Sequence, residues 1–319
     1  MARCGFVLFC KEMAIIQISA MLNNIVVTSK LLWSCVDVKI GMDMRLWGDA
    51  TGVEQLPVLE MLAAQGYQGV EIPVCGQGRS ALKLLSVALD GLGLAVTTSA
   101  RLPAHANPLS PDEATRRAAV DYLCARVDES ATLGSQLLSG GLFQAQGVFS
   151  GKPPSDREWE WSRSCLREVA DYAAKMGVSL ALEFQSRFDA YLINTAAEAA
   201  RMCRDVGHLN IGVLYNTFHA HLEEFNPARA LPAAGEQLLH VCLSESHRGE
   251  LGRGQVQWRE TFATLDFLNY SGWLMVQALA IAKDPPGTQN TWRNNFDSRE
   301  QLAADAIQLI QQILRIQRQ

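Results

Sequence analysis

Polar side chains stand at or next to the ends of apolar runs, where they could take part in chemistry. Glu183 closes one such run, and Asn216, Cys242 and Gln277 stand near the ends of three later ones. A carboxylate in this position can accept a proton from a substrate or bind a cation. His219 could contact a substrate or only hydrogen-bond a loop carbonyl. Cys242, taken by itself, is typical of a small buried apolar residue.

The segments that must position these residues are short β-type runs alternating with longer helix-type segments. Strands are predicted at residues 38–46, 69–73, 94–99, 135–140, 178–184, 210–215, 238–243 and 273–278. Helices are predicted at 52–64, 81–91, 111–133, 155–175, 196–205, 226–234, 256–268 and 298–316. Repeated strand-then-helix units favour an α/β fold of the (β/α)8 TIM-barrel type, in which functional side chains stand at the carboxyl ends of the strands.

The segment 1–37 is apolar but interrupted by charged and amide residues. No run in it approaches the roughly 18 to 20 residues that a transmembrane helix needs. Its apolar stretch 5–10 is also shorter than the core of a signal peptide. We therefore expect 1–37 to be an extension outside the fold, residues 38–319 to form one barrel, and the protein to have no membrane partner.

Composition restricts the class of protein further. The chain has 319 residues, of which 48% are hydrophobic and 19% charged, so it can bury a substantial core. The net charge is −5 and the basic residues form no block, which argues against nucleic acid as a partner. Eight cysteines without a closely spaced pair favour a reducing, cytoplasmic location.

Several motifs occur in the order and spacing of a known family. They include Gly66-Tyr67-Gln68-Gly69-Val70-Glu71, Ala181-Leu182-Glu183, Asn216-Thr217-Phe218-His219 and Leu243-Ser244-Glu245. With these motifs the chain resembles the xylose-isomerase-like TIM barrel superfamily of sugar phosphate isomerases and epimerases, in its D-tagatose 3-epimerase and hydroxypyruvate isomerase branch. The resemblance implies a ketose or related small carbohydrate as substrate, and assembly as a homodimer or homotetramer.

The resemblance also implies a metal-assisted proton transfer. In the family a divalent metal, often Mn, Co or Mg, is held by Glu, Asp, His and Glu at the ends of strands five to eight. The two glutamates also move the proton, while the metal stabilises the enediolate that forms. These four metal-ligand positions fall on Glu183, Asn216, Cys242 and Gln277, and the two catalytic ones on Glu183 and Gln277.

Of these positions, only Glu183 keeps the family's residue. A hard cation is expected to bind weakly to amides and a thiol, and Gln277 cannot transfer a proton. The metal site is therefore expected to be degraded. The resemblance assigns substrate-binding positions to His219, Arg248 and Asp189, with Asp189 in place of the family's usual glutamate.

Three functions stay open at this point. The first is an isomerase or epimerase that keeps some activity, on an unusual substrate or through an altered metal site. The second is a catalytically inactive relative that binds a sugar or acts as a regulator. Bound divalent metal would favour the first over the second. A DNA-repair nuclease of a related barrel is disfavoured, because its three-metal site needs more histidines and acids than the strand ends supply, and because the chain is acidic.

Overall fold

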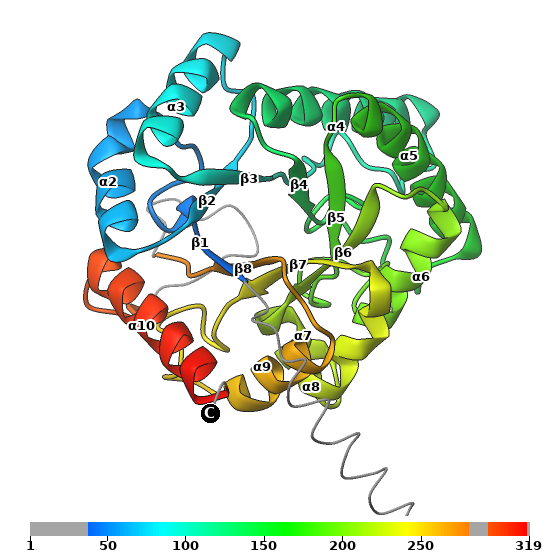
Figure 1. Ribbon diagram of the computed structural model, residues 1–319. Coiled ribbons are helices and arrows are strands. Elements are labelled where there is room, and N and C mark those ends of the chain that lie inside the picture. Colours follow the sequence, from blue (N-terminus) through cyan, green and yellow to red (C-terminus); the bar gives the residue numbers. More distant parts are fainter. Residues whose placement is uncertain (1–37, 281–292, 318–319) are drawn as a thin grey trace, which may run out of the picture. The chain divides into compact units, whose positions relative to one another are not determined.

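The computed structural model describes residues 38–280 and 293–317, so the predicted extension 1–37 lies outside the described residues and stays a prediction. Eight parallel strands close into a barrel in sequence order (Figure 1). The predicted (β/α)8 barrel is therefore confirmed. The strands are β1 (Lys39–Asp43), β2 (Gly69–Pro73), β3 (Ala95–Ser99), β4 (Leu137–Gly140), β5 (Ser179–Glu183), β6 (Ile211–Asn216), β7 (Leu238–Leu243) and β8 (Trp273–Val276).

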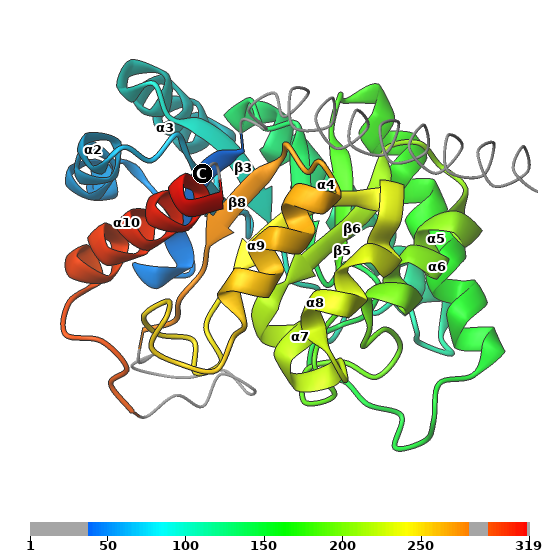
Figure 2. The ribbon, with the colours of Figure 1, turned by 60° about the horizontal axis from the view of Figure 1, so that its bottom comes forward.

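Helices surround the strands on the outside (Figures 1 and 2). The amphipathic pattern places their apolar residues against the outward side chains of the barrel. None of the described helices is both long and apolar enough to cross a membrane. The helices are α2 (Leu56–Gln65), α3 (Arg79–Leu92), α4 (Glu113–Leu133), α5 (Asp156–Lys175), α6 (Ala196–Val206), α7 (Thr217–Glu223), α8 (Pro227–Ala230), α9 (Trp258–Phe267) and α10 (Arg299–Gln317).

Several helix starts differ from the prediction, and side-chain caps explain the start of α4 and the presence of α7. Helix α4 begins at Glu113 rather than residue 111, because the Asp112 carboxylate accepts a hydrogen bond from the backbone N–H of Thr115. Helix α7 was not predicted. It begins directly after β6 because the Asn216 side chain accepts from the backbone N–H of Phe218.

The core has two parts, because alternate strand residues point into the barrel or out toward the helices. The outward side chains join helix residues in one large cluster, which includes Val70, Val213, Val241, Leu85 and Leu166. The inward ones form a small apolar cluster of Leu137, Ala181, Leu214, Cys242 and Met275. Polar residues take the remaining inward positions, among them Glu71, Thr97, Ser139 and His240, and all of these are buried.

Candidate functional site

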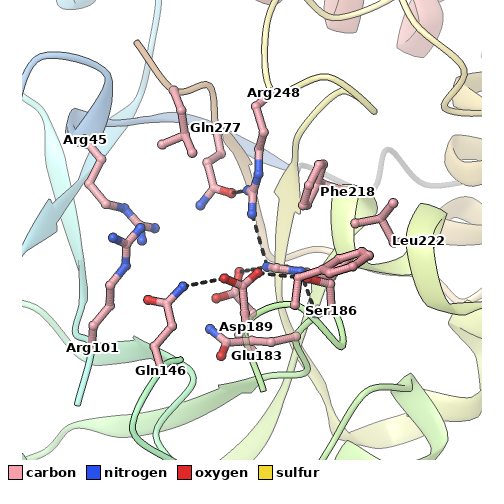
Figure 3. Close-up of a pocket in the computed structure, with 14 residues that line it drawn as sticks. Arg45, Arg101, Gln146, Glu183, Ser186, Asp189, Phe218, Leu222, Arg248 and Gln277 are labelled. Atoms are coloured by element: carbon pink, nitrogen blue, oxygen red, sulfur yellow. Dashed lines mark hydrogen bonds and ion pairs between the residues drawn. The ribbon is translucent and has the colours of Figure 1, made fainter. Parts of the chain in front are cut away.

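A pocket of about 210 Å³ lies at the carboxyl ends of the strands, where the fold predicts a functional site (Figure 3). Arg45 reaches it from the turn after β1, Glu183 from the end of β5 and Gln277 from just beyond β8. The volume suits a small molecule of roughly monosaccharide size. Other side chains of its lining are Arg101, Asp189, Phe218, His219, Leu222 and Arg248.

Glu183, Asn216 and Gln277, predicted to lie together, do so. The Asn216 Nδ2 group donates to Glu183 Oε1 over 2.7 Å and to Gln277 Oε1 over 2.9 Å. All three side chains are nearly or fully buried. The orientation of this amide group is fixed, because its Oδ1 accepts a hydrogen bond from the backbone N–H of Phe218 over 3.0 Å. The same hydrogen bond caps helix α7. An N–H donor therefore faces Glu183 and Gln277, where a metal ligand would need a lone pair.

Gln277 is held from two further directions. Its Nε2 donates to Asp43 Oδ2 over 3.0 Å, and its Oε1 also accepts from Arg248 Nη1. Arg248 has a left-handed backbone with φ 61°, an unusual conformation for a residue with a side chain. Its guanidinium lies 3.7 Å from the centre of the Phe218 ring, which gives a cation–π contact. A positive charge thus stands beside the predicted fourth ligand position.

His219 lines the pocket as predicted and is held in one tautomer. Its Nδ1 accepts the backbone N–H of Ser186 at 2.9 Å, so the ring proton of the neutral form is on Nε2. Nε2 faces Arg248 Nη2 at 3.2 Å and Glu183 Oε1 at 4.0 Å. Burial, reinforced by the charge of Arg248, lowers the pKa of His219 well below its usual value. The imidazole is therefore neutral at neutral pH and can donate a hydrogen bond into the pocket.

Asp189, also predicted, is an acceptor in the pocket wall. Its Oδ2 accepts from the Ser186 hydroxyl and its Oδ1 from Gln146 Nε2, each over 2.8 Å. It belongs to the loop after β5 that also carries Ser186, which binds His219. Asp189 thus fixes the loop that orients the imidazole, besides lining the pocket itself.

Cys242, the predicted third ligand, lies apart from this hydrogen-bonded set. It is fully buried inside the barrel, where burial raises the pKa of its thiol well above the usual value. Among the described residues it forms one group with Glu71 and His240 in which the potential ligand atoms lie within 4.8 Å of one another. A thiol, an imidazole and a carboxylate would suit zinc better than manganese or magnesium.

The four predicted ligand positions do not fit a hard divalent cation in this arrangement. Such cations prefer several oxygen ligands. Here Glu183 supplies the single carboxylate, Asn216 presents an N–H group, and the oxygen of Gln277 already accepts two hydrogen bonds. The guanidinium of Arg248 would also repel an added cation. The site instead holds its polar groups together by hydrogen bonds.

A buried ionic chain beneath this set was not predicted. Arg45 lies 2.7 Å from Asp43 Oδ2 and 3.5 Å from Glu71 Oε1, and Glu71 Oε2 lies 3.0 Å from His240 Nε2. Burial opposes ionisation of Asp43, but the charge and hydrogen bonds of Arg45 lower its pKa below the usual value. One signal was available in the sequence, because Asp43 and Glu71 are the single acids of strands β1 and β2.

The matching family model is described as the xylose isomerase-like TIM barrel, and it covers residues 59–312. The chain belongs to this family. An L-ribulose 3-epimerase from Methylomonas sp. (strain DH-1) is 29% identical to the chain over 279 residues, which cover 86% of this chain and 97% of the relative. A ketose 3-epimerase from Arthrobacter globiformis is 27% identical, over 84% of this chain and 93% of the relative.

Solved structures of epimerases are also similar to this chain in fold. The D-allulose 3-epimerase from Methylomonas sp. superimposes with a TM-score of 0.81 at 28% identity, and the match covers 87% of this chain and 98% of that one. A structure of an L-ribulose 3-epimerase has a TM-score of 0.83 at 27% identity, covering 88% and 96%. The predicted family and its ketose 3-epimerase branch are confirmed.

Proposed function

We propose that this protein is a sugar isomerase or epimerase that acts on a ketose or a related small carbohydrate, with Glu183 as the group that moves the proton. The observation that supports this most directly is the place of Glu183. Its carboxylate ends β5, lines the pocket, and has Oε1 held by the amide of Asn216. The ketose 3-epimerase relatives, which match almost over their whole length, supply the substrate class.

The reaction requires removal of a proton from a carbon next to a carbonyl group. Glu183 accepts this proton, and the electron pair of the broken C–H bond moves to form an enediolate. The enediolate oxygen is stabilised by nearby hydrogen-bond donors. Arg248 and the Nε2–H of His219 face this space, so they are the donors that we assign to the oxygen.

The return of the proton decides the outcome. Inversion at one carbon needs a proton donor on the opposite face of the enediolate, and the amide of Gln277 has no acidic proton to give. Return from Glu183 to the neighbouring carbon on the same face, with transfer of the hydroxyl proton from one enediolate oxygen to the other, gives an isomerisation and needs no second carboxylate. The proposal therefore favours isomerisation over 3-epimerisation unless another group acts from the far side.

A second candidate is an inactive sugar-binding or regulatory relative. The amides of Asn216 and Gln277 favour it, because they keep the shape of acids while lacking their charge and basicity. In that case the pocket binds a sugar through Arg248, Asp189 and His219 without chemistry.

Proton exchange separates the two candidates. The protein is incubated in D2O with L-ribulose, D-fructose or D-tagatose, each with a chelator and, separately, with Mn²⁺, and NMR follows deuterium entering next to the carbonyl. Exchange or a new sugar supports the enzyme. Binding by calorimetry without exchange for any sugar would establish the binding protein instead. Neither binding nor exchange, with these ketoses and with their carboxylate and phosphate analogues, would contradict both.

The predicted cytoplasmic location and the predicted homodimer or homotetramer stay part of this proposal. Light scattering during size-exclusion chromatography measures the assembly.

A further inference from the structure

We propose that the substrate of this pocket carries a negatively charged group, a carboxylate or a phosphate, which Arg101 and Arg45 bind. The inference rests on the proposed carbohydrate function and specifies its substrate class. Neutral ketoses would then be poor ligands, and sugar acids or sugar phosphates good ones.

The first support is the position of the arginines. Arg45 and Arg101 line the same pocket from the segments that follow β1 and β3. Figure 3 shows their guanidinium groups directed toward each other on one side of the pocket, with Phe218 and Leu222 on the other. Arginine presents several N–H donors in a planar fork that matches the oxygens of a carboxylate or phosphate.

The second support is the balance of charge. The lining contains the guanidinium groups of Arg45, Arg101 and Arg248, but among its described residues the carboxylates are those of Glu183 and Asp189. His219 is neutral in this environment. The hydrogen bond and ring contact of Arg248 go to Gln277 and Phe218, which are both uncharged. The side chains that line the pocket therefore include more guanidinium groups than carboxylates, with Asp43 and Glu71 paired to Arg45 from behind.

The third support is mutual repulsion. Burial, together with the charge of Arg45, lowers the pKa of Arg101 to about 10, although Glu183 and Asp43 act in the opposite direction. Arg101 thus remains charged at neutral pH next to another guanidinium. An anion placed between the two would reduce this repulsion, which a neutral sugar cannot do. Arg45 is anchored from behind by Asp43, so it can stay in place for such a ligand.

A simpler reading is that the arginines only balance the buried acids Asp43 and Glu71 and the pocket acid Glu183. In that case a neutral sugar and its charged analogue would bind equally well. Three probes decide between the readings because they share the ketohexose skeleton and differ at one carbon. They are D-fructose, D-fructuronate with a carboxylate at carbon 6, and D-fructose 6-phosphate.

The experiment is calorimetric titration of the full chain with each probe. We expect at least one charged probe to bind about 10- to 100-fold more tightly than D-fructose, the range for one or two hydrogen bonds to a charged group. The charged probe that binds better identifies the anion. Arg101→Ala should remove the preference for the charged probe, and Arg101→Lys should restore part of it.

The matched control is Arg117→Ala, which removes an exposed arginine of α4 outside the pocket and should keep the full preference. Circular dichroism checks that each variant is folded. Equal binding of all three probes, or a preference that survives Arg101→Ala, would overturn this inference and leave the proposed function intact. Lack of binding by every probe would overturn both.

Discussion

The amide of Asn216 donates to the carboxylate of Glu183 over 2.7 Å while its oxygen caps the helix that follows. The carboxylate is therefore oriented by a residue that the backbone itself holds in place. This arrangement gives Glu183 a fixed direction into the pocket without a metal ion. It also makes Glu183 the first residue to change in a test of the proposed chemistry.

Glu183→Gln should keep the fold and lose the chemistry. Gln has the same shape, and its oxygen can still accept from Asn216, but it cannot take a proton. We expect proton exchange of a substrate sugar in D2O to slow by about 10² to 10⁴, the usual contribution of a general base. Glu160→Gln, a change at an exposed glutamate of α5, is the control. Unchanged exchange in Glu183→Gln would assign the proton transfer to another group, with Asp189 the next to examine.

Mn²⁺ should change the Tm of the natural chain little. It should raise the Tm of a variant with a restored ligand set by much more. This variant combines Asn216→Asp, Cys242→His and Gln277→Glu. The three changes add two carboxylates and an imidazole near Glu183. Without metal these like charges should destabilise the variant. Binding of Mn²⁺ should then raise its Tm in a concentration-dependent way, since a ligand that binds only the folded state stabilises it.

Thermal unfolding with and without Mn²⁺, and elemental analysis after dialysis, measure both effects. A natural chain that retains about one manganese per molecule would show that the present residues bind the metal after all. A folded triple variant that binds no Mn²⁺ and whose Tm does not change with Mn²⁺ would show that the surrounding pocket also differs from a metal site.

The stability of the protein should depend on His219 below pH 6.5. The folded state lowers the pKa of His219, so the unfolded chain binds a proton at a higher pH than the folded one. The stabilisation that this pKa difference gives to the folded state is complete above the pKa that His219 has in the unfolded chain. It is lost as the pH falls toward the pKa that His219 has in the folded state. The slope from one such group is at most about 1.4 kcal/mol per pH unit.

His219→Asn keeps an acceptor for Ser186 but removes the titration, so it should flatten urea-unfolding stability between pH 6.5 and 4.5. His105→Asn, at an exposed histidine, should keep the original slope. If the two variants had the same slope as the natural chain, His219 would not be the residue responsible.

Arg45 should contribute strongly to stability, because its removal leaves two buried carboxylates without their cation. Asp43 and Glu71 have no exposed side-chain surface, and Arg45 lies 2.7 Å from the first and 3.5 Å from the second. Breaking a buried ion pair by removing one partner costs about 3 to 5 kcal/mol. Arg45→Met should therefore lower the free energy of unfolding by about that amount in urea titrations.

Arg117→Met, which removes exposed ion pairs with Asp121 and Glu168, should cost less than about 1 kcal/mol. A similar small cost for Arg45→Met would mean that water or a neighbouring group replaces the guanidinium.

The sequence was sufficient for the barrel, because each of its strands is a short apolar run bounded by turns, and the family motifs put them in order. It also brought Glu183, Asn216 and Gln277 together, since the carboxyl ends of the strands surround the same end of a closed barrel. The site roles of these residues stay predictions. The direction of the Asn216 amide could not be predicted, because it depends on a cap to a helix that the sequence pattern did not reveal.

Two arginines of the pocket were missed for a related reason, whereas Arg248 had been predicted. Arg45 and Arg101 follow strands that are far apart in the chain, and their approach depends on the paths of two turns. The partners of Arg45 are Asp43 and Glu71, which were visible only as single acids in their strands. A pattern of isolated charges cannot say which acid meets which base across a barrel.

The hydrogen bond between Gln277 and Asp43 limits the order in which mutations can accumulate. A glutamate at position 277 would place a second carboxylate 3.0 Å from Asp43. That change is tolerable only if position 43 loses its charge first or a cation arrives at the same time. Positions 43 and 277 are therefore epistatic, and a lineage moving from the amide to the carboxylate form of this barrel would have to alter its first strand first or gain a bound cation with the same change.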